Sequence, residues 1–499
     1  MDALANIALG FSVAFTPANL AYCLLGCLVG TLIGVLPGIG PVATIAILLP
    51  QTFSLAPESA LIMLAGIYYG AQYGGSTTAI LANMPGETSS VVTCLDGHKM
   101  ARKGEAGLAL AVVALGSFFA GTVANLVVAL AGPPLSALAY SFGQAEYFAL
   151  MTLGLVAAVV LASGDLVKAI GMAMIGVVLG LVGTDVNTGA QRFTFGLFEL
   201  ADGIGFLVIA MGVFGLGEIV ANLEQGADRE VFAKAPRGLL PPWRKLKRAV
   251  PSVLRGTVLG SLLGILPGGG AVLASFASYM LEKRIAKGPE RFGHGAIEGV
   301  AAPESANNAA AQTSFIPLLT LGIPPNAVMA LMVGALTIHN IQPGPGVMAA
   351  NPALFWGMIA SMWIGNLMLL ILNLPLVGLW VRLIAIPYRL IFPAILVFCA
   401  IGVYSVSLST TDIVLTAAFG LIGYFGRKLE CEGAPLLLGF VLGPMMEESL
   451  RRAMVLSGGD ATVLVTRPIS AILLLLALGL LAATILPTVN TKRRGIFAE

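Results

Sequence analysis

The sequence predicts an all-α polytopic membrane protein with about a dozen hydrophobic helices and re-entrant hairpins in two inverted-topology repeats. Its 499 residues are 57% hydrophobic and only 10% charged, whereas soluble domains carry about 25% charged residues. Apolar runs of about 20 residues, each long enough to span a bilayer, recur along the chain. A glycine-rich stretch in the first half is repeated in the second half.

The repeated stretch predicts two helix interruptions. Residues 30–40, GTLIGVLPGIG, and residues 260–270, GSLLGILPGGG, share Gly-x3-Gly-x2-Pro-Gly-x-Gly without a gap. Proline removes a backbone donor and glycine allows conformations that other residues avoid, so a helix breaks in each copy. At membrane depth, broken backbone survives only when it lines a cavity or is buried in protein. Duplicated breaks of this kind indicate the binding site of a transporter.

The distribution of basic residues predicts the topology. No lysine or arginine precedes Lys99, and residues 223–250 form the strongest cytoplasmic marker. We therefore divide the chain into a first transmembrane half (1–222), a basic cytoplasmic linker (223–250) and a second transmembrane half (251–499). Basic residues flank 252–281 on both sides, which favours a re-entrant hairpin over one kinked helix. The same reasoning makes 18–55 a hairpin that begins and ends outside, so the two copies are inverted.

The remaining hydrophobic segments are predicted as helices. Residues 59–85 cross inward and 297–322 cross outward, and further helices are expected at 106–131, 145–163, 166–184, 203–222, 353–373, 390–404, 412–425, 434–446 and 468–487. Lys492, Arg493 and Arg494 place the C-terminus inside.

A stretch rich in small and polar residues follows each glycine motif. Residues 70–87 and 303–326 align through Pro85 and Pro324. A single Ser or Thr often only joins helices, but clusters beside helix breaks favour a site. Half-helix N-termini attract carboxylates, and freed carbonyl and amide oxygens suit Na⁺. The predicted substrate-binding residues are Gly38, Gly40, Ser76, Thr77, Thr78, Gly268, Gly269, Gly270, Asn307 and Asn308. The predicted coupling-ion residues are Gln72, Gln312, Thr313, Pro85, Pro324 and Glu304.

Few charged side chains enter the apolar segments. Glu87 and Glu304 could hold a cation or a proton, or could cap a helix; Glu304 follows a proline, which is common in a first turn. Both interpretations stay open. The charged run at Glu447, Glu448, Arg451 and Arg452 is typical of a solvated loop with local ion pairs.

Several function classes are excluded or weakened. A net charge of +2 gives no basic footprint for nucleic acid. The chain has no P-loop motif and no Cys/His set with metal-ligand spacing, so we expect no resident cofactor and no structural metal. An intramembrane enzyme would need a nucleophile and a base within reach, and no convincing pair is present. A passive channel for small anions, built on the same inverted repeat, remains the alternative to a transporter.

At these motifs the chain resembles the large membrane subunit of the tripartite tricarboxylate transporters, the TctA family. The resemblance rests on GTLIGVLPGIGP, GAQYGGSTTAILANMPGE, the second LPGGG and PESANNAAAQTSFIPLLTLGIPPN. It covers residues from about 10 to 485 and shows no clear departure from the pattern.

The resemblance implies a secondary importer of organic carboxylates in the bacterial inner membrane. Such subunits work with a small membrane subunit (TctB-like) and a periplasmic solute-binding protein (TctC-like) that delivers the substrate. It also implies an ion gradient, commonly of Na⁺, as the driving force, with H⁺ as the other possibility.

Overall fold

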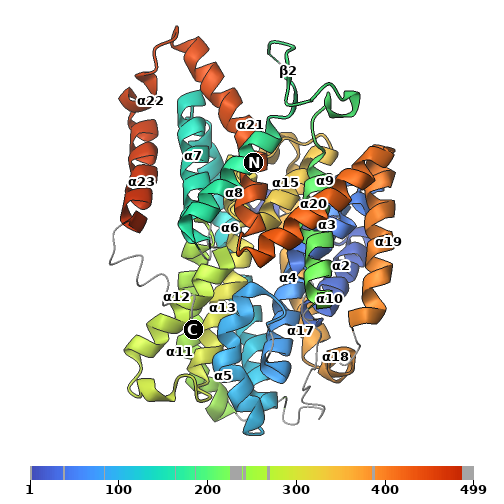
Figure 1. Ribbon diagram of the computed structural model, residues 1–499. Coiled ribbons are helices and arrows are strands. Elements are labelled where there is room, and N and C mark those ends of the chain that lie inside the picture. The colour runs from blue at the N-terminus through green and yellow to red at the C-terminus, as the bar shows by residue number, and fades with distance from the viewer. Residues whose placement is uncertain are drawn as a thin grey trace.

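The computed structural model describes residues 3–36, 40–83, 85–162, 165–185, 187–224, 239, 243–266, 270–384 and 388–485. The predicted breaks at 37–39 and 267–269, most of the linker, and the basic C-terminal end lie outside these residues. Within them the chain is almost entirely helical (Figure 1). The only strands there are the pair β1 (Gly183–Thr184) and β2 (Gln191–Arg192).

The helices of the first half are α1 (Ala3–Ala14), α2 (Pro17–Val35), α3 (Pro41–Leu48), α4 (Pro57–Ala82), α5 (Val91–Arg102), α6 (Ala106–Ala139), α7 (Gln144–Leu161), α8 (Leu166–Gly180), α9 (Phe206–Ala210) and α10 (Gly217–Glu224), with short 3-10 or π turns at Leu49–Ser54, Thr88–Ser90, Phe198–Leu200 and Met211–Leu216. Most of them fall in the predicted ranges, but α1 and α5 lie where no helix was predicted and α6 continues eight residues past its predicted end.

The second half continues the all-helical architecture. It contains α11 (Trp243–Leu263), α12 (Gly270–Ile285), the turn Pro289–Arg291, α13 (Glu298–Thr313), α14 (Phe315–Leu321), α15 (Ala327–Ile338), α16 (Gly346–Ala350), α17 (Pro352–Asn373), α18 (Val377–Ile384), α19 (Tyr388–Ser407), α20 (Thr410–Lys428), α21 (Gly433–Leu456), α22 (Val463–Thr466) and α23 (Pro468–Ile485). The first of these, α11, begins inside the range predicted for the linker.

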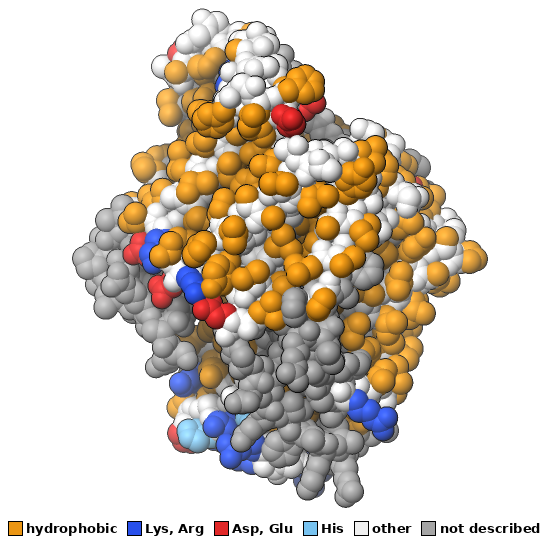
Figure 2. Space-filling view, turned by 45° about the vertical axis from the view of Figure 1, so that its right-hand side comes forward, with side chains coloured by type: hydrophobic (Ala, Val, Ile, Leu, Met, Phe, Trp, Pro, Cys, Tyr) orange, Lys and Arg blue, Asp and Glu red, His pale blue; other side chains and the backbone are white. Residues whose placement is uncertain are grey.

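The helices carry the surface of a membrane protein. Among the described helices α2, α6, α7 and α17 are long and apolar enough to cross a bilayer. Figure 2 shows hydrophobic side chains across the middle of the visible face, with Lys and Arg gathered mainly below them. The fold is therefore an all-α, multi-pass membrane protein.

Two central helices organise the packing. Every residue of α4 from Ser59 to Ala82 and every residue of α13 from Gly299 to Thr313 is buried. α2 packs along α4, and α11 and α12 pack along α13. The halves also pack crosswise, because α6 of the first half lies on α13 and α17 of the second half lies on α4. Both central helices are thus covered by elements of both halves.

Glycines set the closest contacts, and they do so twice. A Cβ atom on Gly26, Gly30 or Gly34 of α2 would lie 2.2–2.4 Å from a carbonyl oxygen of Met63, Ile67 or Ala71 on α4. In the second half, Gly256 and Gly260 of α11 and Gly264 directly after it make the same contacts. Their Cβ atoms would lie 2.2–2.5 Å from the carbonyl oxygens of Ala302, Ala306 and Ala310 of α13. Equivalent glycines of the two copies are 230 residues apart in the sequence (256 − 26), and the residues they contact are 239 residues apart (302 − 63). The internal repeat is therefore present in the helix packing as well as in the amino-acid sequence.

The helices on either side of the second glycine motif, α11 and α12, pack against each other. On α11, the Ser252 hydroxyl donates to Glu282 of α12 at 2.8 Å, and Arg255 Nε donates to the same carboxylate at 2.6 Å. Both contacts are far from the end of α11 at Leu263 and the start of α12 at Gly270, so the two helices run antiparallel. In Figure 1, α5 lies at the lower end after α4, whereas α15, which follows α14, lies in the upper half. α5 and α15 thus lie toward opposite ends of the molecule in this view.

The loop predicted at Glu447–Arg452 is wrong, because α21 continues to Leu456. The charged side chains form ion pairs within α21 and with the loop that follows α8. Arg451 pairs with Glu447 at 2.6 Å and with Asp185 at 2.8 Å, while Arg192 pairs with Asp185 at 2.7 Å and with Glu447 at 2.9 Å. The segment that holds β1 and β2 is thereby fastened to α21.

We expect Gly260→Ala to destabilise the protein, because the added Cβ would lie 2.2 Å from the Ala306 carbonyl oxygen. Overpacking of a tight contact costs about 1–3 kcal/mol. Thermal unfolding in detergent should show a lowered midpoint. The matched control is Gly171→Ala on α8, where a Cβ meets nothing within 4 Å. Equal midpoints for the two variants would contradict the packing role.

We expect Asp185 to hold its loop through charge. Burial opposes ionisation, but the backbone amides of Asn187 and Thr188 and the guanidinium groups of Arg192 and Arg451 outweigh it, so the pKa of Asp185 is lowered. Its contribution is therefore complete above the ordinary carboxyl pKa and is lost as the pH falls through the lowered value. Hydrogen exchange at neutral pH should be faster in the loop of Asp185→Asn than in that of wild type. Unchanged exchange would show that the ion pairs do not hold the loop.

Candidate functional site

A polar cluster joins the two central helices inside the bundle. On α13, Glu304 is fully buried. Its carboxylate accepts a hydrogen bond from the Ser76 hydroxyl of α4 at 2.5 Å and another from the Thr93 hydroxyl of α5. Ser76 and Thr93 are buried as well. One carboxylate of the second half is therefore held by two hydroxyls of the first half.

A second carboxylate belongs to the same cluster. Glu87 accepts from Ser89 Oγ at 2.5 Å and from Asn307 Nδ2 of α13 at 3.1 Å. The Ser89 hydroxyl also lies 3.2 Å from Gln72 Oε1 on α4. The chain of contacts thus runs from α4 through the turn after Pro85 to α13, and again crosses between the halves.

The cluster lies beside the segments that flank both helix breaks. Gly86 touches the first glycine helix, since a Cβ there would lie 2.0 Å from the Gly34 carbonyl oxygen. The Thr78 hydroxyl donates to the Val35 carbonyl at 2.8 Å. Both carbonyls belong to the last residues of α2, directly before the break.

In the second half, the contact beside the break is made by α12, the helix that follows it. At Gly270, the first residue of α12, φ is +38°, and a Cβ there would lie 3.3 Å from Asn326 Nδ2. Asn326 caps α15 by accepting from Met329 N at 2.9 Å. The N-termini of α12 and α15 are therefore neighbours, and helix N-termini favour anions.

Glu87 and Asn326 occupy equivalent places in the two repeats, separated by the same 239 residues as Pro85 and Pro324 (326 − 87). Both are extended N-cap residues, with φ and ψ of −149° and 165° at Glu87 and of −154° and 173° at Asn326. Glu87 is therefore a cap and also a member of the cluster.

For Glu304 the capping interpretation is wrong. α13 begins at Glu298, so Pro303 and Glu304 lie inside the helix rather than in its first turn. The side chain points to α4 and α5 instead of to a helix end.

Other predicted residues lie near this cluster with partners of their own. Asn308 Nδ2 donates to Ser117 Oγ of α6 at 2.7 Å. The hydroxyls of Thr77 and Thr313 donate to carbonyls one turn earlier in their own helices, at 3.3 and 3.1 Å. Pro324 is buried and Pro85 is exposed. Gly40 is the N-cap of α3, with open space where a Cβ would be. Gly38, Gly268 and Gly269 lie outside the described residues.

Two acceptor oxygens in this region have no partner. Asn307 Oδ1 and Gln312 Oε1 are buried and accept no hydrogen bond within the described structure. A buried acceptor without a donor is costly, and carbonyl and carboxylate oxygens are the ligands that hard cations prefer. Asn307, whose amide donates to Glu87, therefore adds an acceptor oxygen beside the carboxylates.

The cluster lacks a positive side chain among its described contacts. The partners of Glu87 and Glu304 are the hydroxyls and the amide given above. Burying an ion costs several kcal/mol unless its charge is compensated. The arrangement can therefore bind a cation or a proton, and it can relay that binding between α4 and α13.

The sequence analysis missed two members of the cluster and one residue at the neighbouring helix N-termini. Ser89, Thr93 and Asn326 were absent from the predicted set. Asn326 could have been found by extending the alignment of Pro85 and Pro324 by two residues. Thr93 had no comparable signal, because it lies in α5, outside both glycine motifs and both polar stretches.

Comparisons with known proteins agree with this architecture. Residues 20–438 match the tripartite tricarboxylate transporter TctA family. An Agrobacterium vitis protein, described as an uncharacterized 52.8 kDa protein in the TAR-I ttuC' 3' region, is 60% identical over 499 residues, covering 100% of this chain and 99% of its own length. A second A. vitis protein, from the TAR-II ttuC' 3' region, is 62% identical over 240 residues, 48% of this chain and 99% of its own length. No solved structure matches the chain. Because the family match covers most of the sequence, the chain belongs to the tripartite tricarboxylate transporter TctA family.

Proposed function

We propose that this protein is the large membrane-spanning subunit of a secondary, ion-gradient-driven and binding-protein-dependent importer of tricarboxylate-type anions. The observation that carries the proposal is the pair of carboxylates, fully buried Glu304 and half-buried Glu87, held between α4 and α13 by uncharged partners. Since burial penalises an uncompensated charge, the cluster calls for a cation. The family match supports transport as the activity.

The coupling ion is Na⁺, with H⁺ as the other candidate. Carboxylate, amide and hydroxyl oxygens suit either one. Glu304 supplies the charge at the contact of α4 and α13. Gln72 and Gln312 supply amide oxygens, Thr313 a hydroxyl, and Pro85 and Pro324 backbone carbonyls.

The substrate carboxylates are proposed to lie against the helix breaks. The N-terminus of α12 at Gly270 adjoins the N-terminus of α15, and both can donate backbone N–H groups to an anion. Gly38, Gly40, Gly268 and Gly269 would let the backbone approach closely. Polar side chains would complete the site; these are Ser76, Thr77, Thr78, Asn307 and Asn308.

Alternating access would follow from the crosswise packing. α4 and α13 each contact elements of the opposite half, so a relative movement of the halves changes the surroundings of both carboxylates. Inverted repeats commonly provide two such arrangements.

The partners are proposed to be a small TctB-like membrane subunit and a periplasmic TctC-like solute-binding protein. The protein would lie in the bacterial inner membrane with its C-terminus in the cytoplasm and the basic ends of α5, α11 and α12 facing the cytoplasm. The opposite end carries the loop after β2, in which Phe195 and Phe198 are 87% and 88% exposed. This exposure supports a protein contact there.

We expect accumulation of a labelled carboxylate in proteoliposomes that contain all three components and an inward Na⁺ gradient. Uptake should exceed the external concentration and should fall to equilibration when the gradient is collapsed. Replacement of Na⁺ by K⁺ is the control. Persistence with a proton gradient alone would identify H⁺ as the coupling ion. Equilibration without accumulation under every gradient would favour the passive channel.

We expect Glu304→Gln to uncouple uptake while leaving the fold intact, since the Gln amide can accept from one of the two hydroxyls of Ser76 and Thr93 and donate to the other. At subsaturating ion concentration, uptake should fall about tenfold to a hundredfold, because a contact with a charged group contributes about 1.5–3 kcal/mol. Initial rates at several Na⁺ concentrations give the measurement. Glu430→Gln, whose side chain is 83% exposed, is the control and should behave as wild type. Full ion-dependent uptake by Glu304→Gln would remove Glu304 from the mechanism.

A further inference from the structure

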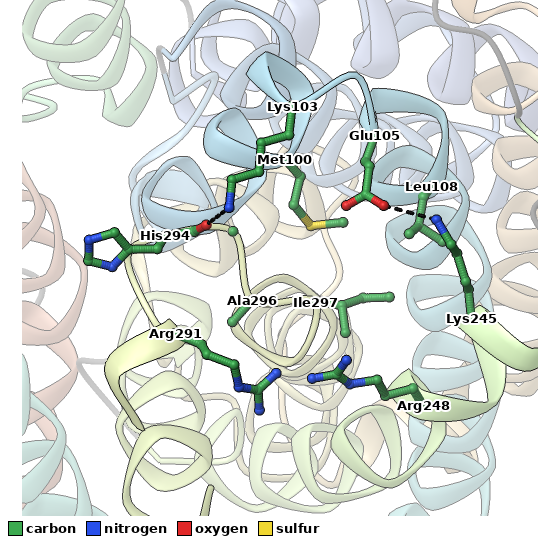
Figure 3. Close-up of a pocket in the computed structure, with 11 residues that line it drawn as sticks. Met100, Lys103, Glu105, Leu108, Lys245, Arg248, Arg291, His294, Ala296 and Ile297 are labelled. Atoms are coloured by element: carbon green, nitrogen blue, oxygen red, sulfur yellow. Dashed lines mark hydrogen bonds and ion pairs between the residues drawn. The ribbon is translucent and has the colours of Figure 1, made fainter. Parts of the chain in front are cut away.

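A half-open cavity lies at the basic end of the protein, apart from the polar cluster. Its volume is about 340 Å³, at the lower end of the range for small-molecule sites. It is lined by the end of α5, the start of α6, the first turns of α11 and the segment that leads into α13 (Figure 3). Both halves of the chain therefore contribute to its wall.

Four cationic side chains line this cavity, from three separate segments: Lys103, Lys245, Arg248 and Arg291. Lys245 pairs with Glu105 at 2.9 Å, and Lys103 donates to the His294 carbonyl at 2.6 Å. Figure 3 shows the two guanidinium groups directed toward one another, across the opening from Lys103 and Glu105.

The two arginines share one carboxylate oxygen. Arg248 Nε lies 3.0 Å and an Arg291 terminal nitrogen 3.5 Å from Glu298 Oε1. A guanidinium group has five N–H donors, so most of the donors on both side chains remain available for a ligand.

The negative charges around the cavity do not balance the positive ones. Glu105 and Glu298 are the paired carboxylates. Asp96 lies behind the wall, where its oxygens accept from the amides of Gly295 and Ala296 and from the Tyr279 hydroxyl. Even with Asp96 included, the four cations outnumber the three carboxylates. Two convergent guanidinium groups match carboxylate and phosphate geometry better than any neutral ligand.

We propose that this cavity binds a compact oxyanion with two or more negative charges, such as phosphate or a polycarboxylate, between Arg248, Arg291 and Lys103. The anion competes with Glu298 for the two guanidinium groups. It can come from solution or from a phosphate-bearing lipid headgroup, since the side chains of Arg248 and Arg291 are 55% and 40% exposed.

The cavity is connected to the polar cluster through α13. Glu298 is the first residue of this helix, and Glu304 lies six residues later, about 9 Å along the axis. An anion that displaces Glu298 from the two arginines breaks the ion pairs at the start of α13, the helix that carries Glu304. This link to transport rests on the proposed function, whereas binding of the anion does not.

Binding is measured by titrating inorganic phosphate into the purified full-length protein at constant ionic strength, with calorimetry as the readout. The double variant Arg248→Gln/Arg291→Gln should bind at least about tenfold more weakly, since charge-assisted contacts are lost. Arg452→Gln is the control: its side chain is 61% exposed, pairs with Glu448 within α21, and lies outside the cavity. Wild-type affinity in the double variant would overturn the site.

Glu298→Gln tests the competition in the opposite direction. Removal of this carboxylate frees both guanidinium groups, so phosphate should bind more tightly than to wild type; equal or weaker binding would overturn the competition. In a parallel arm, nanodiscs of phosphatidylcholine are compared with nanodiscs containing phosphatidic acid. Loss of phosphate binding only with phosphatidic acid identifies the lipid as an occupant. Absence of saturable binding in both arms would overturn the proposal, and no outcome depends on uptake.

Discussion

The contact of glycine with helix backbone is the constraint on which the rest of this structure depends. Gly34 and Gly264 stand in the last turns before the two breaks, and each lies against a central helix at a distance that admits no side chain. Because α2 and α11 approach this closely, the last described residues before each break lie against α4 and α13. A larger residue would separate the helices and move these ends away from the two central helices.

Burial then determines what the polar cluster requires. Hydroxyls and amides can donate to Glu87 and Glu304, but they bring no positive charge. Glu304 is fully buried and Glu87 is half-buried, so leaving the charge of Glu304 uncompensated costs several kcal/mol. In the proposed mechanism the need for a coupling ion thus follows from the packing of α4 on α13, and no dedicated metal-binding loop is needed to explain it.

The helices could be predicted from local sequence patterns, but the site depends on contacts between segments that are far apart in the sequence. The recurring apolar runs and the Pro-Gly punctuation predicted most helix ranges to within a few residues. They could not show that Ser76 and Glu304, 228 positions apart, would share a hydrogen bond. Pro303 suggested a helix start because proline suits a first turn, yet α13 begins one turn earlier. The run at Glu447–Arg452 suggested a loop, although its ion pairs with Asp185 and Arg192 let α21 continue.

The two repeats share a scaffold but not a chemistry. Glu87 and Asn326 cap equivalent helices with nearly the same backbone angles, yet only one of them is a carboxylate. Glu304 corresponds to Ala65 in the other repeat (304 − 239), so the second carboxylate has no counterpart either. The two carboxylates therefore lie where non-equivalent residues of the two halves meet, at the contact of α4 with α13. Any movement that separates these helices must break the bond between Ser76 and Glu304, and in the proposed transporter this makes ion binding and the movement of the halves a single event.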